Sequence, residues 1–230
     1  MANLLKTVRT LLLATLVLLP ATATAQHWQF QIGGGLSSQF GSMKSVGAYR
    51  IGVGYEYEFD QHWTFTPSIF FVGKGWRTPD TYVPVVDDNN EPVYDDQGQR
   101  AMSRMSQSTA ADYVEIPLVF SYYHRLAESR YIVFGAGPYA AVGVAGKVKT
   151  KGDGQRIGDQ KLFYEGTTFA KNGQRRFDCG ISAHLGYQFP SSLTIALQAD
   201  FGLIPTSSSN KRNITGLVTL TYTLRRDTNR

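Results

Sequence analysis

Residues 176–189 read RFDCGISAHLGYQF, and their apolar and polar side chains alternate with a period of two. Successive side chains of a β-strand point to opposite faces, so alternation over this length predicts a long strand between two different environments. One face is apolar: Phe177, Cys179, Ile181, Ala183, Leu185, Tyr187 and Phe189. The other is polar or small: Arg176, Asp178, Gly180, Ser182, His184, Gly186 and Gln188.

Seven further stretches alternate in the same way, and in all eight the apolar face carries no charge. Soluble strands usually have about 5–6 residues, whereas a tilted membrane-spanning strand needs about 9–11. We therefore predict an all-β fold, an eight-stranded antiparallel transmembrane β-barrel whose apolar face meets lipid. The pattern alone also allows a soluble barrel or sandwich of opposite polarity. The seven stretches are residues 28–36, 48–59, 63–75, 113–123, 131–147, 193–203 and 214–225.

The connections between these stretches alternate between short and long. This alternation is typical of short periplasmic turns and longer extracellular loops, and it places both termini in the periplasm. The short connections are residues 60–62, 126–129 and 190–192, and the longer ones are residues 39–46, 77–111, 148–175 and 205–211.

Aromatic residues of the apolar face gather near the predicted periplasmic ends of the strands. Amphipathic rings prefer the interface between lipid and water, so we predict an aromatic girdle there. Ordinary aromatic enrichment in strands is the alternative. The girdle residues are Trp28, Tyr57, Phe59, Trp63, Tyr122, Tyr187, Phe189 and Tyr222.

The first 25 residues have the layout of a secretory signal peptide. Lys6 and Arg9 precede an apolar run over residues 11–19, and a small-residue motif ends at Ala25, directly before Gln26. The apolar run is too short to span a bilayer. A buried N-terminal helix is the alternative. We predict a signal peptide over residues 1–25, cleavage between Ala25 and Gln26, and an outer-membrane β-barrel domain over residues 26–230 of a bacterial envelope protein.

Composition excludes several classes of protein. The chain has 230 residues, a formal charge of +5 and one cysteine. A single cysteine rules out a disulfide scaffold, and no Cys/His cluster has the spacing of zinc ligands. Removing the signal peptide leaves a charge of about +3, which is too small to indicate nucleic-acid binding. We expect no metal and no cofactor.

Three segments of the chain are similar to motifs of the PorT-like outer-membrane β-barrel proteins. Residues 113–118, YVEIPL, resemble the family's Y-[VL]-E-[IL]-P motif, and residues 135–139, GAGPY, resemble its G-x-G-P-Y strand. The segment from Asn213 to Tyr222 resembles the last strand, although the usual Y-[RK]-F ending is replaced by Tyr-Thr-Leu and a polar tail. The resemblance implies an eight-stranded outer-membrane barrel. One family member is tied to protein secretion, whereas most have no assigned activity.

The polar face carries basic and acidic residues in equal number. An eight-stranded barrel is just wide enough for its own side chains to fill, and an unpaired charge there is costly. We predict that the charges pair into a network that plugs the lumen. A gated path lined by the same charges is the alternative. The residues are Arg50, Lys74, Lys147, Arg176 and Arg225, with Glu56, Glu58, Glu115, Asp178 and Asp200.

Evidence for catalysis is weak. A barrel deacylase needs a His and a Ser close together on the lipid face, with a carboxylate to orient the His. His184 and Ser182 share a face, but it is the polar one. Cys179 lies on the apolar face, where a thiol is usually inert. We expect no catalytic residue and no enzymatic activity.

Two long loops have opposite charge. Loop 77–111 is acidic and contains a repeat, PVVDD at residues 84–88 and PVYDD at residues 92–96, with a predicted hairpin turn over Asp88–Asn90. We expect the strands of stretches 63–75 and 113–123 to continue out of the membrane as a ribbon. Its carboxylates miss the spacing of a calcium loop, so solvated charge is the better interpretation. Loop 148–175 is basic. We hypothesise that the two loops meet over the barrel mouth, or alternatively that the basic loop contacts lipopolysaccharide phosphates.

The sequence therefore predicts a non-enzymatic structural or accessory role in the cell envelope, carried out by the loops and turns. The resemblance to the PorT-like family adds protein secretion as a process in which this role could lie. The expected partners are outer-membrane lipid and lipopolysaccharide, with other envelope proteins as further candidates. A narrow, gated transport channel is the first alternative, and a lipid-modifying barrel enzyme is the second.

Overall fold

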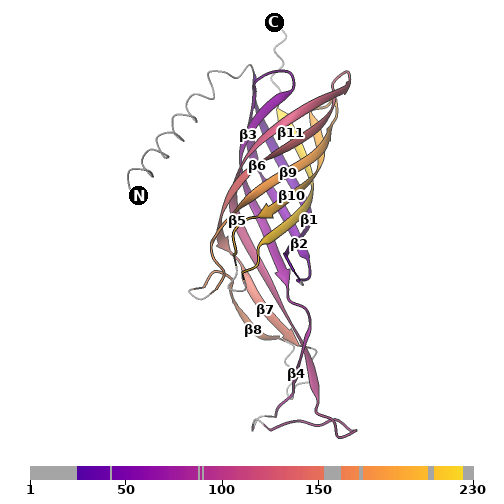
Figure 1. Cartoon of the computed structure of the whole chain (residues 1–230), viewed down its shortest axis with the longest axis vertical. Coiled ribbons are helices and arrows are strands. Elements are labelled where there is room, and N and C mark those ends of the chain that lie inside the picture. The colour runs from indigo at the N-terminus through magenta and orange to yellow at the C-terminus, as the bar shows by residue number, and fades with distance from the viewer. Residues whose placement is uncertain are drawn as a thin grey trace, which may run out of the picture.

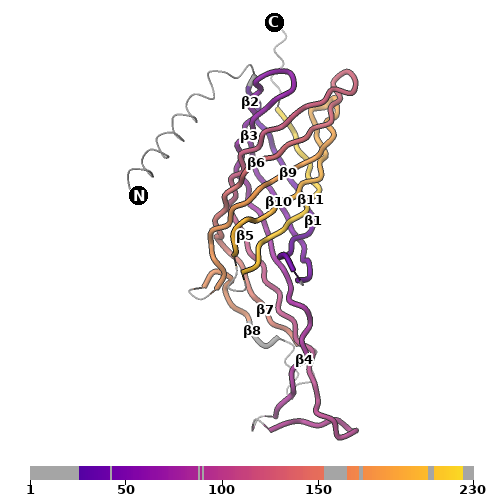
Figure 2. The backbone as a smooth tube through the Cα atoms, in the orientation of Figure 1, coloured from indigo at the N-terminus to yellow at the C-terminus, as the bar shows by residue number. Residues whose placement is uncertain are grey.

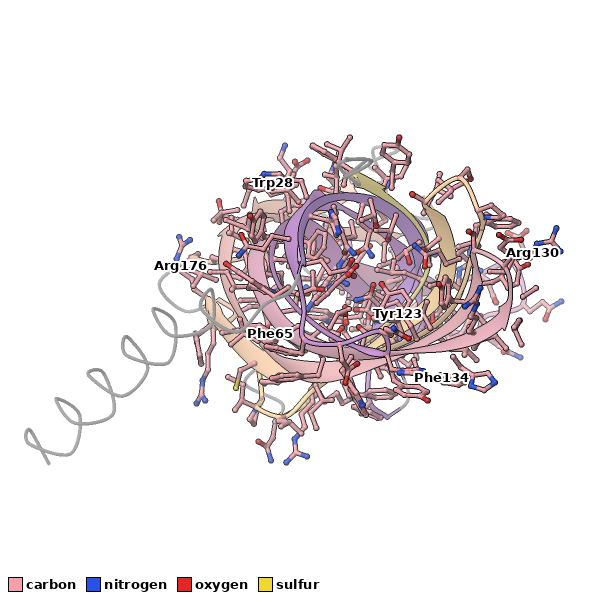
Figure 3. All side chains as sticks on the ribbon, turned by 90° about the horizontal axis from the view of Figure 1, so that it is seen from above. Trp28, Phe65, Tyr123, Arg130, Phe134 and Arg176 are labelled. Atoms are coloured by element: carbon pink, nitrogen blue, oxygen red, sulfur yellow. The ribbon has the colours of Figure 1, made fainter. Side chains whose placement is uncertain are left out.

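The computed structural model describes residues 25–41, 43–87, 89, 91–152, 162–170, 173–206 and 210–224. Within these residues, eight strands pair antiparallel with their neighbours in a closed ring, in the order β1-β2-β3-β5-β6-β9-β10-β11, and β11 returns to β1. Figure 1 shows the strongly tilted strands, and the view along the barrel in Figure 3 shows the closed ring. The prediction of an eight-stranded antiparallel barrel is confirmed. The strands are β1 Ala25–Gln39, β2 Val46–Glu58, β3 Trp63–Arg77, β5 Met102–Ala127, β6 Arg130–Ala145, β9 Phe177–Gln188, β10 Leu193–Gly202 and β11 Asn213–Leu224.

The two faces of the ring differ as the alternation predicts. Apolar side chains point outward and are exposed, with Leu197 64% and Val218 54% accessible, whereas the polar face is turned inward and buried. In water such an outer surface would be unfavourable, because burial of apolar area is the main stabilising term of a soluble fold. A lipid environment removes that cost, so the exposed apolar surface is the lipid-facing wall of the barrel.

The two ends of the barrel differ in their connections. At one end, here called the turn end, short connections join β2 to β3, β5 to β6 and β9 to β10, and both β1 begins and β11 ends there. The opposite end, here called the loop end, carries the long segments (Figure 2). Of the predicted signal peptide, only Ala25 lies among the described residues, where it is the first residue of β1. Among those residues no helix is long and apolar enough to cross a membrane.

The small ring forces neighbouring backbones close together on its inner side. A Cβ atom added at Gly137 of β6 would lie 1.9 Å from the carbonyl oxygen of Leu118 in β5. Real Cβ atoms do not approach oxygen so closely, so only glycine fits this inward position. Glycine on the polar face of the alternating pattern is therefore a consequence of tight curvature.

Beyond the loop end, three further strands extend the barrel wall. They are β4 Thr81–Pro84, β7 Lys147–Gly152 and β8 Leu162–Thr167. β5 has 26 residues, and its outer part pairs with β4 on one side and with β7 on the other, while β8 pairs with β7. These strands form an extension that projects away from the ring (Figure 1).

The tip of the extension is a junction of three hairpin arms. The backbone N–H of Val93 donates to the carbonyl of Val85 (3.1 Å), that of Ala101 to Val93 (2.9 Å) and that of Val85 to Ala101 (2.9 Å). This cycle of three hydrogen bonds joins the stem formed by β4 and β5 to two further arms. Bridges between Val86 and Pro92 and between Tyr94 and Arg100 define the two arms. We call residues 82–104 the head.

The repeated sequence of the acidic loop builds the two arms in the same way. Asp87 Oδ1 accepts hydrogen bonds from the backbone N–H groups of Asn89 (2.9 Å) and Glu91 (2.8 Å). Eight residues later, Asp95 Oδ1 accepts from those of Gln97 (3.0 Å) and Gln99 (2.8 Å). The first aspartate of each repeat therefore closes a turn. Asn89 lies in the predicted hairpin turn, and the neighbouring Asp88 and Asn90 lie outside the described residues.

Candidate functional site

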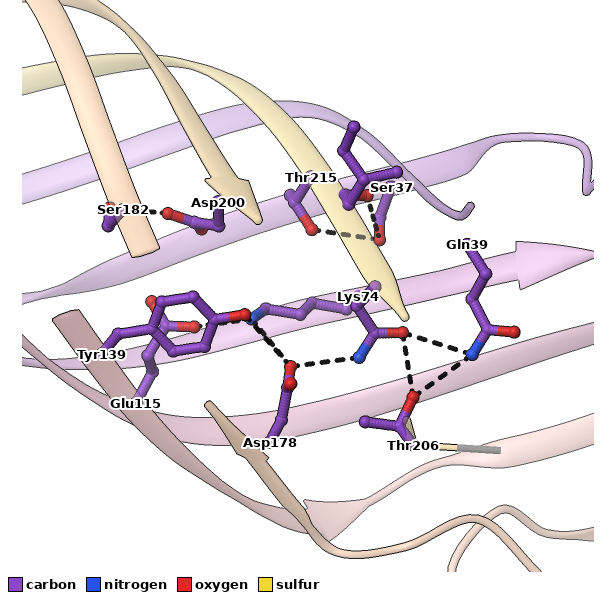
Figure 4. A network of polar contacts seen from close by, with 12 residues as sticks. Ser37, Gln39, Lys74, Glu115, Tyr139, Asp178, Ser182, Asp200, Thr206 and Thr215 are labelled. Carbon is purple, nitrogen blue, oxygen red and sulfur yellow. Dashed lines mark hydrogen bonds and ion pairs between the residues drawn. The ribbon is translucent and has the colours of Figure 1, made fainter. Parts of the chain in front are cut away.

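Five charged side chains from five strands meet inside the ring, towards the loop end. Arg50 of β2 forms ion pairs with Glu115 of β5 and with Asp200 of β10, the latter at 3.0 Å. Lys74 of β3 pairs with Glu115 at 2.7 Å and with Asp178 of β9 at 3.5 Å. All five side chains are at most 2% exposed. We call this set the ion-pair core; Figure 4 shows Lys74 among its partners.

Neutral polar groups surround the ion-pair core. Ser182 donates to Asp200 Oδ1 (2.6 Å), and Gln198 Nε2 donates to Ser182 Oγ (2.9 Å). Asn213 Nδ2 donates to Asp178 Oδ2 (3.1 Å), and Gln39 Nε2 donates to the amide oxygen of Asn213 (3.3 Å). Buried charge is costly unless hydrogen bonds satisfy it, so these contacts stabilise the ion-pair core in the narrow lumen.

Aromatic rings complete the lining of the cations. The ammonium of Lys74 lies 4.5 Å from the ring centroid of Tyr139 and 5.5 Å from that of Tyr113. The guanidinium of Arg50 lies 4.7 Å from the ring centroid of Phe70. Such cation–π contacts stabilise a cation that has lost its water.

The loop-end side of the core is covered by Phe169, which follows β8. Its side chain is 6% exposed and packs edge-on against Tyr113, with ring centroids 5.6 Å apart. Thr168 holds the segment in place by donating to the carbonyl of Ala110 (2.6 Å). The Arg176 guanidinium lies 5.3 Å from the Phe169 ring and donates to the Gly143 carbonyl (2.9 Å). The ion-pair core and Phe169 together fill the loop-end half of the lumen.

The turn-end half of the lumen is less filled. It holds a cavity of about 60 Å³ whose lining includes Gln31, Ser121, His184 and Gln198. Glu56 lines the same cavity and accepts hydrogen bonds from Gln29 Nε2 and the Tyr123 hydroxyl, both at 2.7 Å. Tyr123 also borders a wider, open hollow at the turn end, so the polar cavity lies directly behind the mouth.

The structure brings together five of the predicted lumen residues and places the others elsewhere. Glu56 is buried nearer the turn end, and Glu58 lies at the rim, 3.6 Å from His27 Nε2. Arg176 is exposed ahead of β9 and supports Phe169. Arg225 lies outside the described residues.

The prediction that Lys147 belongs to the lumen is wrong. Its side chain is 68% exposed and pairs with Glu165 at 2.8 Å outside the ring. The cause is Gly146, whose φ of 153° interrupts the strand between β6 and β7 and ends the alternation. The residue after this break no longer follows the inward face of β6.

The two long loops meet through backbone pairing between β5 and β7. Lys147 and Lys149 both pair with Glu165 of their own loop, the latter at 3.6 Å. Asp80 of the acidic loop pairs with Lys44 at 3.1 Å. In the described part of the chain, no ion pair joins the acidic loop to the basic one. The extension runs away from the barrel (Figure 1), while Phe169 of the basic loop covers the loop-end side of the ion-pair core.

The predicted girdle residues lie on the outer face at the turn end. Trp28 and Trp63 are about half exposed, at 53% and 49%. Ring contacts join Trp63 to Tyr122 (centroids 5.1 Å apart) and Tyr187 to Phe189 (4.8 Å). In the end view, Trp28 and Phe134 point outward from the ring (Figure 3). Their contact with the membrane interface stays a prediction.

The residues weighed for catalysis lie in three different settings. Ser182 is bound to Asp200 and Gln198, and His184 faces the cavity. Cys179 is a free thiol. Among the described residues, no three His, Cys, Asp or Glu side chains are grouped to hold a metal ion.

Sequence reasoning missed Phe169, Asn213, Gln39 and Thr206, whose hydroxyl accepts a hydrogen bond from Gln39 Nε2 (3.3 Å). Alternation could have placed Asn213 and Gln39 on the inner face, since Asn213 continues the polar series of its strand by one step and Gln39 by two. No periodic signal marks Phe169 or Thr206, which lie in irregular segments.

A closed ring with an apolar outer wall and a buried ionic interior defines a transmembrane β-barrel of the bacterial outer-membrane type. Residues 23–208 match the family described as "Outer membrane protein beta-barrel domain", and the chain belongs to this family of outer-membrane proteins.

Comparison with solved structures finds the attachment invasion locus protein Ail of Yersinia pestis. It is 12% identical, with a TM-score of 0.39, over 86% of this chain and 97% of that one. The same protein in complex with the heparin analogue sucrose octasulfate is 11% identical, with a TM-score of 0.38 and the same coverage. Likeness at this level carries no argument about function. No curated protein matches the sequence significantly.

Proposed function

We propose that this outer-membrane barrel is non-enzymatic and has a structural or accessory role in the cell envelope, acting through the segments outside its ring. The observation that carries the proposal is the filled loop-end half of the lumen. Arg50, Lys74 and Glu115 are buried in one network, and Phe169 covers it. A barrel closed in this way serves as a rigid anchor in the membrane. The segments outside the ring are then the surface that can interact with other molecules.

The proposal orients the loop end outward and the turn end to the periplasm, as the difference in connection lengths favours. Outer-membrane lipid would contact the apolar wall, lipopolysaccharide phosphates would contact the basic loop 148–175, and other envelope proteins would bind the extension. The PorT-like motifs at residues 113–118 and 135–139 support a secretion-related partner, since one member of that family has such a role.

A narrow, gated channel is the second candidate, and the turn-end cavity favours it. A cavity of about 60 Å³ lies inside the ring, and its lining runs from Glu56 to Phe70 and Gln198 beside the ion-pair core. Arg50 Nε and Nη1 are buried without a hydrogen-bond partner among the described protein atoms. If Arg50 changed partners, the cavity could be extended through the ion-pair core.

Two measurements on the purified, full-length protein test the proposal. In planar bilayers, the accessory role predicts no conductance steps, while regular steps that are lost in Phe70→Trp, which enlarges a cavity-lining side chain, would favour the channel. Isolation of the tagged barrel from native outer membrane in mild detergent should recover a stoichiometric envelope protein. A silent barrel that is recovered alone would contradict the accessory role.

A further inference from the structure

We propose that one face of the head is a docking surface for a protein whose apolar contact area is bordered by lysine and arginine. The inference rests on the accessory role proposed above and locates it on particular side chains. The face consists of Tyr82, Pro84, Pro92, Tyr94, Arg100 and Met102, and we call it the tyrosine face.

Strand pairing places these residues on a single surface. Tyr82 pairs with Arg104 and Pro84 with Met102 in the stem, and Tyr94 pairs with Arg100 in one arm. Directly paired residues of antiparallel strands share a face, and residues two apart along a strand do so as well. The even-numbered residues therefore continue one face from the stem into the arms.

On the opposite face of the head, side chains are buried against the rest of the protein. Val85, at the three-way junction, is 4% exposed, and Ser103 of the stem is 3% exposed. By contrast, Tyr82 is 62% exposed, Tyr94 61% and Met102 41%. The head thus buries small side chains on one side and leaves its large apolar ones uncovered on the other.

The chemistry of the tyrosine face fits a protein partner. Tyr, Met and Arg are enriched at protein–protein interfaces, and exposed Tyr and Arg are frequent sources of binding energy. The face lies at the far end of the extension, away from the lipid-facing wall (Figure 1), so membrane contact does not account for its apolar character.

Exposed carboxylates around the tyrosine face indicate that the partner carries basic residues around its apolar area. Glu91 and Asp96 are exposed in the turns of the two arms, and neither carboxylate forms an ion pair within the described chain. Asp87 and Asp95 in the same turns are engaged with backbone N–H groups. A rim of unpaired carboxylates favours a partner with basic residues at matching positions, which speeds and orients association.

The fixed backbone of the head supports binding without rearrangement. The three hydrogen bonds of the junction involve only main-chain atoms, and so do the donors to Asp87 and Asp95. Exposed side chains on the opposite side can therefore be changed without removing a contact that holds the arms together. This property makes the surface testable in the folded protein.

The test uses a photo-crosslinking residue, p-benzoylphenylalanine, in place of Tyr82 or Tyr94 in the full-length protein in cells, with Lys151 of β7 as the control position. We expect a discrete protein adduct from positions 82 and 94 and none from position 151. A glycan adduct, an adduct to a second copy of this chain, or no adduct would overturn the inference.

Purified components then measure the contribution of the face. Against the crosslinked protein, Tyr82→Ser/Tyr94→Ser should raise Kd about tenfold or more, while Lys151→Ser should leave it unchanged. Glu91→Gln/Asp96→Asn should weaken the salt dependence of binding. Equal affinity of wild type and the tyrosine variant would overturn the inference.

The tagged-barrel isolation separates this inference from the proposed function. If the partner is recovered with wild type and equally with Tyr82→Ser/Tyr94→Ser, the accessory role stands and the docking surface is wrong. If wild type recovers no partner and conducts ions, the accessory role itself is wrong.

Discussion

Arg50 neutralises two carboxylates of the ion-pair core at once, and among the described residues it is the only cation that forms an ion pair with Asp200. Replacing it with methionine keeps most of its volume but leaves Asp200 without its cation, and Glu115 with Lys74 alone. Breaking a buried ion pair in this way costs about 3–5 kcal/mol. We expect Arg50→Met to lower the unfolding midpoint in urea, measured by the shift in gel mobility between folded and unfolded barrel.

Lys147→Met is the matched control for this measurement. Lys147 also pairs with a carboxylate, but its side chain is 68% exposed. Exposed pairs contribute little to stability, so the midpoint should not change. Equal destabilisation by the two variants would mean that the ion-pair core does not hold the barrel together.

Asp60 gives a pH-dependent prediction at the turn between β2 and β3. The backbone N–H groups of His62 (2.7 Å) and Trp63 (2.8 Å) donate to its Oδ1, and these bonds hold the pKa of Asp60 below its ordinary range. A lowered pKa means that the carboxylate stabilises the turn above the unfolded-state pKa, and that this contribution is lost as pH falls through the folded-state pKa.

The measurement is an NMR titration of the side-chain carboxyl carbon of Asp60 in lipid nanodiscs. Its main titration step should lie below the ordinary range of aspartate. Asp60→Asn should remove the step. A step centred within or above the ordinary range would contradict the assignment of these hydrogen bonds.

The strands of the ring were predictable because each separates lipid from lumen along its length. The predicted stretch 193–203 became β10, Leu193–Gly202, and 214–225 became β11, Asn213–Leu224. The expected ribbon beyond stretches 63–75 and 113–123 corresponds to β4 and the outer part of β5, whereas β7 and β8 were missed because strands outside the membrane do not separate lipid from lumen. The alternation predicts which face of the strand a charge lies on, but not how far along the barrel axis it lies. Glu58 therefore could not be distinguished from Glu115, although Glu58 lies at the rim and Glu115 lies in the core.

The repeat in the acidic loop predicts unequal roles for neighbouring aspartates. Asp95 closes its turn through two backbone donors, whereas Asp96 makes no such contact. Loss of a capping oxygen of this kind costs about 0.5–2 kcal/mol in helices, and a comparable loss is expected in this turn. Asp95→Ala should speed proteolytic cleavage of the head, and Asp96→Ala should not. Equal cleavage rates would show that the side-chain cap is unimportant.

Gly146 lies at the break between β6 and β7, and its conformation leaves no room for a side chain. Its φ is 153°, and an added Cβ would lie 2.3 Å from the carbonyl oxygen of Ala110. Gly146→Ala should therefore destabilise the barrel by more than about 1 kcal/mol, since both backbone conformation and space oppose it. Gly216→Ala is the control, because nothing lies within 4 Å of its added Cβ. The urea midpoint distinguishes the two variants. An unchanged midpoint for Gly146→Ala would contradict the backbone conformation described at the break between β6 and β7.

The whole molecule consists of a ring that is closed without its extension and an extension that depends on the ring. Thr78 and Gln107 mark the boundary, where the N–H of Thr78 donates to the Gln107 carbonyl (2.8 Å) and the N–H of Gln107 donates to the Thr78 hydroxyl (3.0 Å). Because these residues are adjacent across the strand pair, a two-residue Asn-Gly turn can join them in place of residues 79–106. The shortened chain keeps the ion-pair core and the β3–β5 pairing up to Arg77 and Ser108.

We expect this shortened barrel to fold, to show the same gel-mobility shift as wild type and to keep a urea midpoint close to that of wild type. Its edge for β7 is shorter, because β7 pairs with Met105–Thr109, so protease sensitivity should rise in loop 148–175 but not in the ring. The same variant should lose the envelope partner that wild type retains. Failure to fold would mean that the extension helps to close the ring, and a retained partner would move the site of interaction to the turns or the barrel wall.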